Sequence, residues 1–91
     1  MATPMVAIGA NLKLIMMNDA ACQVFDLSDN DVVGQAVHDI VPNETAVAFM
    51  TQENNDDIEL EGSFTTNNGT SYQTSISFDK GGGRIVTMTP N

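Results

Sequence analysis

The sequence predicts a single α+β domain with a five-stranded antiparallel sheet and short helices on one face. Two patterns lead to this prediction. Residues 6–17 are mostly apolar and compatible with strands, and helical spacing replaces that pattern after Asn18. Residues 58–64 and 71–78 alternate apolar or small residues with polar ones, as half-buried strands do. A chain of 91 residues can form one hydrophobic core and has no room for a second.

The first two strands are expected at residues 6–9 and 12–17, joined by a turn at Ala10-Asn11. The second strand is apolar on both faces apart from Lys13. Such a strand is either covered on both sides or meets a partner, unless its exposed residues are the ordinary scatter of an edge strand. Residues 1–5 are expected to form a loose lead-in.

The first helix is expected over residues 19–26. Ala21 and Phe25 are four residues apart and therefore share one helical face. Asn18 can cap this helix, because its side-chain oxygen can accept a hydrogen bond from an unpaired backbone N–H of the first turn. Asp19 also suits the positive end of the helix dipole.

Two further helices are expected before the last three strands. The first is a short helical turn over residues 36–41, and the second is a longer helix over residues 44–52. Asn43 can cap the longer helix, in which Val47 and Met50 recur at helical spacing. These two side chains are therefore expected to face the sheet.

The register of the last three strands follows if their apolar residues share one face. A two-residue turn at Asn68-Gly69 would mix the faces of strands 58–64 and 71–78, whereas a three-residue loop at 67–69 keeps apolar residues opposite one another. Gly69 is then expected to have a positive φ. A five-residue loop at 79–83 keeps the apolar residues of the next hairpin on the same face of the sheet. The expected pairs are Phe64 with Tyr72, Leu60 with Ile76, Ile58 with Phe78, Ile76 with Val86 and Thr74 with Met88.

The order of these elements resembles that of a PAS domain, the sensory and interaction module common in signalling proteins. The shared pattern is a β-hairpin, Asn-x-Ala opening a helix, an apolar pair, a glycine and a buried aliphatic residue. In this chain the corresponding residues are Asn18-Asp19-Ala20, Val24-Phe25 with Leu27, Gly34 and Ile40. The resemblance covers the domain at residues 6–89, leaves residues 1–5 and 90–91 as flanks, and implies the strand order 2-1-5-4-3.

The resemblance implies a module that senses a signal or binds a partner. In the family, a small ligand or a partner protein between sheet and helices shifts strand packing, and the change reaches an attached output domain. That output domain would be a kinase, a cyclase or a transcription regulator, in two-component or cyclic-nucleotide signalling. Thr89-Pro90-Asn91 replaces the Asp-Ile-Thr-like exit of many members. The alternatives are a structural dimerisation module with a filled core and no ligand and, less favoured, a small enzyme.

The predicted register places Gly62, Thr74 and Met88 in one row across the middle of the apolar face. Gly62 has no side chain and Thr74 a small one, so this row leaves volume beneath the helices. The volume is either a ligand pocket or a dip that helix side chains fill. The expected pocket residues are Phe25, Ile40, Val47, Met50, Gly62, Tyr72, Thr74, Val86 and Met88. The expected surface for a homodimer comprises Leu12, Ile15 and Met17 on the apolar second strand.

The net charge of the chain argues against polyanionic binding partners. Twelve acidic and three basic residues give a formal net charge of −9, which disfavours binding to nucleic acid and to anionic membrane surfaces. Neither a signal peptide pattern nor an apolar run near the roughly 18 residues of a membrane span is present, so a cytoplasmic domain is expected. Carboxylates at Asp56, Asp57, Glu59 and Glu61 could attract a divalent cation, but a solvated acidic patch is expected instead.

No catalytic or metal site is expected. Cys22 is the only cysteine and lacks a basic neighbour in sequence, so it is expected to be a small buried residue rather than a nucleophile. His38 is the only histidine. Haem-binding members of the family carry a histidine on the longer helix, where this chain has none, and the flavin-binding members have an Asn-Cys pair that residues 35–41 lack. Neither haem nor flavin is therefore supported, and the ligand is unknown.

Overall fold

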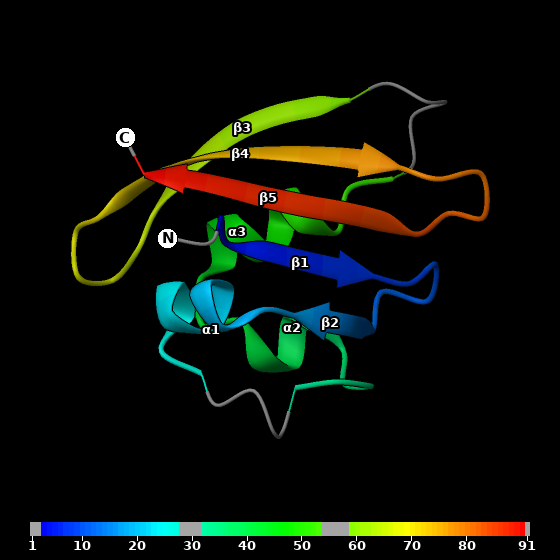
Figure 1. Cartoon of the computed structure of the whole chain (residues 1–91), viewed down its shortest axis with the longest axis horizontal. Coiled ribbons are helices and arrows are strands. Elements are labelled where there is room, and N and C mark those ends of the chain that lie inside the picture. Colours follow the sequence, from blue (N-terminus) through cyan, green and yellow to red (C-terminus); the bar gives the residue numbers. More distant parts are fainter. Residues whose placement is uncertain (1–2, 28–31, 54–58, 91) are drawn as a thin grey trace.

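Five antiparallel strands form one sheet in the computed structural model, which describes residues 3–27, 32–53 and 59–90. In chain order the elements are β1 (Met5–Ile8), β2 (Leu14–Met17), α1 (Asp19–Phe25), α2 (Val37–Ile40), α3 (Glu44–Met50), β3 (Leu60–Thr65), β4 (Ser71–Phe78) and β5 (Arg84–Pro90). The strand order is β2-β1-β5-β4-β3, so the first and last strands are neighbours, and short helices pack against one face (Figure 1). Both the fold class and the strand order match the prediction.

The register of the last three strands is also the predicted one. Across β3 and β4, Phe64 lies opposite Tyr72, Leu60 opposite Ile76 and Gly62 opposite Thr74. Across β4 and β5, Ile76 lies opposite Val86 and Thr74 opposite Met88. Gly69 has a φ of +92°, as the three-residue loop requires. Ile58, expected opposite Phe78, lies outside the described residues.

The first hairpin turns at Ala10-Asn11 as predicted, but its first strand begins earlier and its second strand begins later. β1 starts at Met5, in the expected lead-in, and the carbonyl of Pro4 accepts a hydrogen bond of 3.1 Å from the N–H of Met88. The lead-in is therefore tied to β5 rather than loose. β2 starts at Leu14 and not at Leu12, because Leu12 has a φ of +63° and belongs to the turn.

The helices are shorter than predicted by one or two residues at their ends. α1 ends at Phe25 because Asp26 adopts the left-handed conformation, with a φ of 56°. The N–H of Leu27 then bonds the carbonyl of Cys22 at 2.8 Å, which closes the helix in a pattern that glycine usually forms. The predicted helices over 36–41 and 44–52 are α2 and α3, and the strand predicted over 58–64 is observed as β3.

Asn18 connects the hairpin to the first helix with a single side-chain amide. Its Oδ1 accepts hydrogen bonds of 3.0 Å from the N–H groups of Ala21 and Met5. Its Nδ2 donates to the carbonyl of Thr3 at 2.8 Å. The first bond caps α1, as predicted, and the other two fix the start of β1 beside it.

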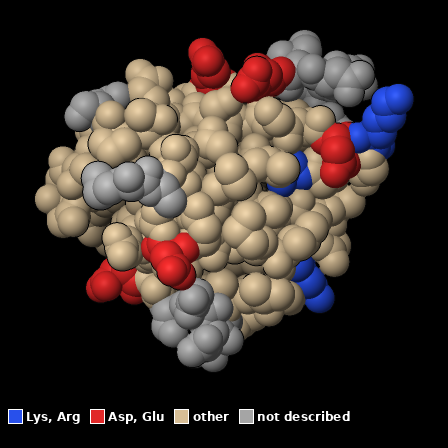
Figure 2. Space-filling model, in the orientation of Figure 1, with Lys and Arg blue, Asp and Glu red and all other residues tan. Residues whose placement is uncertain are grey.

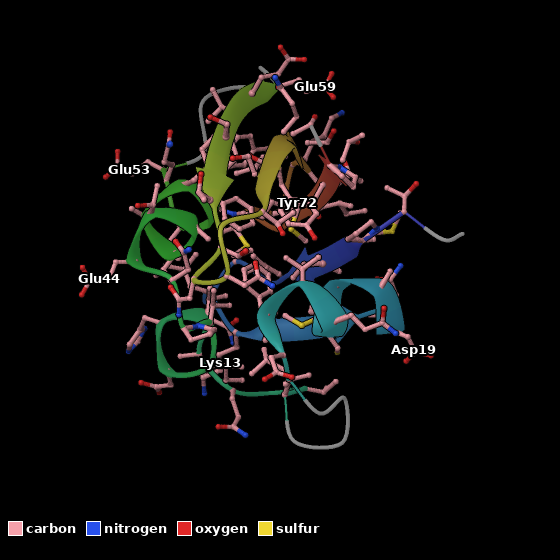
Figure 3. The ribbon with its side chains drawn as sticks, turned by 90° about the vertical axis from the view of Figure 1, so that its left-hand side faces the viewer. Lys13, Asp19, Glu44, Glu53, Glu59 and Tyr72 are labelled. Carbon is pink, nitrogen blue, oxygen red and sulfur yellow. The ribbon has the colours of Figure 1, made fainter. Side chains whose placement is uncertain are left out.

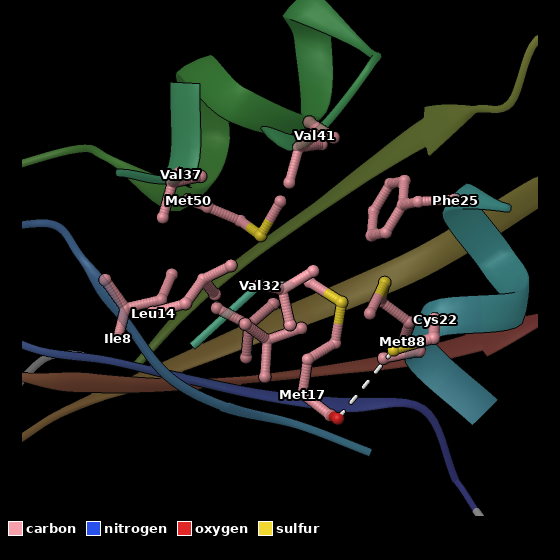
Figure 4. Close-up of a cluster of buried hydrophobic side chains, with 14 of the residues drawn as sticks. Ile8, Leu14, Met17, Cys22, Phe25, Val32, Val37, Val41, Met50 and Met88 are labelled. Carbon is pink, nitrogen blue, oxygen red and sulfur yellow. Dashed lines mark hydrogen bonds between the residues drawn. The ribbon is translucent and has the colours of Figure 1, made fainter. Parts of the chain in front are cut away.

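The hydrophobic core lies between the helices and the inner face of the sheet (Figure 4). Cys22 is buried in it, as predicted, with its Sγ 3.8 Å from the carbonyl oxygen of Met17. The largest fully buried side chains come from both layers and are Ile8, Leu14, Met50, Ile76, Met88, Val6, Val37 and Val86. The sheet and the helices therefore share one core.

Candidate functional site

The residues predicted to line a pocket come from α1, α2, α3 and the three strands β3, β4 and β5. Phe25, Met50, Thr74, Val86 and Met88 are buried. The other members of the set, Ile40, Val47, Gly62 and Tyr72, are partly buried. In Figure 3, Tyr72 lies between the sheet and the helices, whereas Glu44 and Glu53 point outward. The row of Gly62, Thr74 and Met88 crosses the three strands of the meander.

The ring of Phe49, from α3, lies on the Gly62 end of this row. A Cβ atom added to Gly62 would lie 2.6 Å from Cε1 of the Phe49 ring, 2.9 Å from its Cδ1 and 3.0 Å from its Cζ. The ring therefore lies directly on the glycine backbone, and Phe49 itself is only partly buried. At Gly62 the dip is therefore occupied by a helix side chain. The sequence prediction chose Val47 and Met50 and missed Phe49, although a glycine inside a strand signals a close approach by another group.

Thr74, next to Gly62 in the row, carries a buried hydroxyl that lacks a hydrogen bond. Thr74 is 3% exposed, and its Oγ1 has no hydrogen-bond partner within the described part of the chain. A buried polar group left unpaired costs about 1–3 kcal/mol. The middle of the inner face thus combines an aromatic ring, a bare glycine and one polar group able to bond another molecule.

The N-terminus of α3 is attached to β3 through Asn43. The Oδ1 of Asn43 accepts from the N–H of Ala46 at 2.9 Å, which caps the helix as predicted. Its Nδ2 donates to the carbonyl of Thr65 at 2.8 Å. The same amide therefore caps α3 and positions it over the end of β3.

The C-terminus of α3 is attached to β5 through Arg84. This side chain is buried, its Nη1 donates to the carbonyls of Met50, at 3.1 Å, and Gln52, and its guanidinium lies 4.8 Å from the ring centroid of Phe78. Cations at a helix C-terminus satisfy its unpaired carbonyls. Burial lowers the pKa of Arg84 through desolvation. The sequence prediction did not identify this role of Arg84. The signal was present, because Arg84 is two residues from the inward-facing Val86 on β5 and therefore points to the same face of the sheet.

A surface groove of about 590 Å³ lies near the C-terminal end of α1. One residue of the predicted pocket set, Phe25, lines this groove. Its ring stacks on that of Phe64 at a centroid distance of 5.6 Å. Phe64 in turn stacks on Tyr72 at 5.7 Å. None of the row residues Gly62, Thr74 and Met88 lines the groove, so the groove and the row are distinct places.

The expected homodimer surface needs one correction. Ile15 is 60% exposed, but Met17 is only 5% exposed and faces the core. The register shifts between Ala7 and Ile8, so Ile15 is an extra residue on β2 and the alternation is reset beyond it. Met16 therefore takes the outward position, while Leu12 is partly buried in the turn.

Neither the lone cysteine nor the lone histidine forms part of a reactive cluster in the described residues. Cys22 is in the core, and His38 is exposed, with its Nε2 3.2 Å from the Oδ1 of Asp39. Across residues 3–27, 32–53 and 59–90, no group of three His, Cys, Asp or Glu side chains could hold a metal ion. Asp56 and Asp57, from the acidic set, lie outside the described residues. Among the helices described, none is long and apolar enough to cross a membrane.

Known proteins resemble this chain over nearly its whole length. The family model described as "PAS domain" matches residues 3–89. The PAS domain of an HTR-like protein from Haloarcula marismortui is 12% identical, with a TM-score of 0.53 and coverage of 98% of this chain and 81% of that one. A PAS domain from a two-component sensor histidine kinase is 13% identical, with a TM-score of 0.55 and coverage of 98% and 85%. No curated protein matches this chain.

Proposed function

The chain belongs to the PAS domain family, and from this premise we propose that it senses a small ligand on the inner face of the sheet, beneath α3. The observation that carries this proposal is the row of Gly62, Thr74 and Met88, which offers a bare backbone beneath the Phe49 ring and, beside it, a buried hydroxyl with no hydrogen bond in the described structure. Ligand sites in proteins commonly pair an apolar lining with a few polar groups that fix orientation. A sensing role fits these features better than catalysis, for which a nucleophile–base pair would be needed.

The proposed signal leaves the site through the C-terminal end of α3. Phe49 is adjacent to Met50, whose carbonyl is bound by Arg84 at the start of β5. β5 pairs with both β1 and β4 and is the middle strand of the sheet. A ligand that shifts α3 would therefore change the packing of the strand that contacts both halves of the sheet, and an attached output domain would respond to that change.

Protein purified from cells tests this proposal by native mass spectrometry and amide NMR. We expect a bound small molecule, or a compound from a metabolite collection, to shift the amide resonances of β3, β4 and β5. The surface residue Thr70, in the β3–β4 loop, serves as an internal reference that should not shift. If no compound of any chemical class binds, the sensing function is wrong.

A second candidate function, self-association, is favoured by the outer face of the sheet. Met16, Ala7 and Ile85 lie opposite one another on β2, β1 and β5, and the exposed fractions of Met16 and Ile85 are 37% and 48%. Ile15, at 60%, extends this apolar patch. Figure 2 shows that charged side chains lie mainly around the rim of this view, leaving its centre uncharged. The patch would contact a second copy of the chain.

Light scattering of Ile15→Glu tests self-association. If the patch forms a homodimer, the added charge should shift the protein to the monomer, whereas Thr70→Glu, with the same added charge on an exposed loop, should stay dimeric. A monomeric wild type, or equal behaviour of the two variants, would exclude this surface as the dimer contact.

A further inference from the structure

Phe49 packs closely on the sheet and is also partly exposed to solvent. Its ring lies against the Gly62 backbone, 2.6 Å from the place where a Cβ would be, yet the residue is only partly buried. One side of the ring thus faces the sheet, while the side chain still reaches solvent. Rotation about its side-chain bonds could move the ring outward, and side chains at the surface rotate rapidly.

The helix that carries Phe49 is held at both ends while the ring itself is held by packing. Asn43 fixes the start of α3 to Thr65, and Arg84 fixes its end through the carbonyls of Met50 and Gln52. The backbone can therefore stay in place when the ring leaves. The space that opens has the size and flat shape of one aromatic ring.

Thr74 indicates what would fill that space better than Phe49 does. Oγ1 of Thr74, next to Gly62 in the row, is buried without a hydrogen bond in the described structure. A ligand ring with one hydrogen-bonding group would pack on Gly62 in the same way and would also satisfy Thr74. Met88, at the other end of the row, has a flexible side chain that can adapt to the substituent.

The neighbouring rows indicate that the ligand is uncharged. The row on one side of Gly62, Thr74 and Met88 consists of Leu60, Ile76 and Val86. The row on the other side contains Phe64 and Tyr72. None of these side chains is charged at neutral pH. Among these five side chains a charged ligand would lose its hydration without gaining an opposite charge, which is unfavourable in a protein interior. The buried guanidinium of Arg84, in the next row, is already bound to the carbonyls of Met50 and Gln52.

We propose that Phe49 is a built-in plug of the sensory site and that the ligand is a neutral, single-ring aromatic molecule whose one polar group bonds Thr74. This inference rests on the proposed function and specifies the ligand class and the means of regulation. Binding would expel the ring of Phe49 from Gly62. Because Phe49 lies in the last turn of α3, its displacement would act directly on the contact between Arg84 and this helix end.

Phenol and toluene are suitable probes, because they have the same ring and similar size but only phenol can form a hydrogen bond. We would measure both affinities by calorimetry or NMR titration for Phe49→Ala, which vacates the site. Phe49→Ala should bind both probes at least about tenfold more tightly than the wild type does, since no plug has to be displaced. Phe49→Leu, a milder truncation, replaces it if Phe49→Ala does not fold.

The decisive control is the Phe49→Ala/Thr74→Val variant, because valine keeps the shape of threonine and lacks its hydroxyl. The ratio of phenol to toluene affinity should fall about tenfold on adding Thr74→Val, the effect of one lost hydrogen bond. An unchanged ratio, or variants that bind no better than the wild type, would overturn the inference. If other compounds still bind the inner face of the wild type, the proposed sensing function is retained and only the proposed role of Phe49 is rejected. If nothing binds the wild type, the sensing function itself falls.

Discussion

Gly62→Ala is the substitution whose effect the structure defines most closely. The added Cβ would lie 2.6 Å from Cε1 of Phe49, whereas carbon atoms in contact prefer about 3.5–4.0 Å. The ring would have to retreat by about 1 Å, and overpacking of this kind costs about 1–3 kcal/mol. Replacing glycine also stabilises by about 0.4–1 kcal/mol, because it restricts the unfolded chain. We therefore expect a net loss of at most about 2.6 kcal/mol, with a mid-range value of about 1.3 kcal/mol.

A double-mutant cycle separates the clash from any other effect of the alanine. In Phe49→Ala the clashing ring is gone, so adding Gly62→Ala should be neutral or stabilising, and the coupling free energy should be about 1–3 kcal/mol. Urea denaturation measures these differences, which correspond to roughly 4–8 °C in Tm per kcal/mol for a domain of this size.

Gly81→Ala is the matched control, because its Cβ would meet only the Oδ1 of Asp79, at 3.4 Å. That substitution should change the free energy of unfolding by less than about 0.5 kcal/mol. If Gly62→Ala costs the same with and without the Phe49 ring, the ring does not lie on the glycine and the reasoning about the site is refuted.

Three further substitutions test the contacts that position the site. Asn18→Ala removes an amide that makes three hydrogen bonds and should cost about 2 kcal/mol in urea denaturation, whereas Asn18→Asp, which keeps the two accepted bonds, should cost less; equal losses would contradict the assignment. Gly69→Val should lose about 1 kcal/mol or more of thermal stability, because a φ of +92° disfavours β-branched residues, and Gly69→Asn should be milder. Arg84→Met should lower the free energy of unfolding by about 1–3 kcal/mol, because two carbonyls at the C-terminal end of α3 lose their hydrogen-bond donor. It should also accelerate hydrogen exchange in α3, and unchanged exchange there would show that Arg84 does not hold the helix.

The strand register and the helix caps could be predicted because each depends on local chemistry. Alternation with a period of two decides which residues face inward, and only one loop length keeps Phe64 opposite Tyr72. Asn18 and Asn43 were recognisable as caps because each precedes a helical pattern and offers a side-chain oxygen. The fold class follows from these elements and their order.

The contacts between layers could not be predicted, because they depend on how the helices rotate and where strands are irregular. β2 is apolar at every position, so nothing in its pattern reveals that Ile15 is the extra residue, and Met17 was placed on the wrong face. Helical spacing gives the apolar side of α3 but not which side chain meets Gly62. That choice is fixed by the attachments at Asn43 and Arg84, which join α3 to strands far away in sequence.

The most direct measurement is the nuclear Overhauser effect between the ring protons of Phe49 and the α-protons of Gly62, recorded with and without saturating phenol. Without phenol we expect strong cross-peaks, because the ring lies on the glycine backbone. With phenol these cross-peaks should disappear and be replaced by cross-peaks from phenol to Gly62. Phe49 cross-peaks that persist at saturation, with phenol contacting other residues, would contradict the displacement of Phe49 by a ligand.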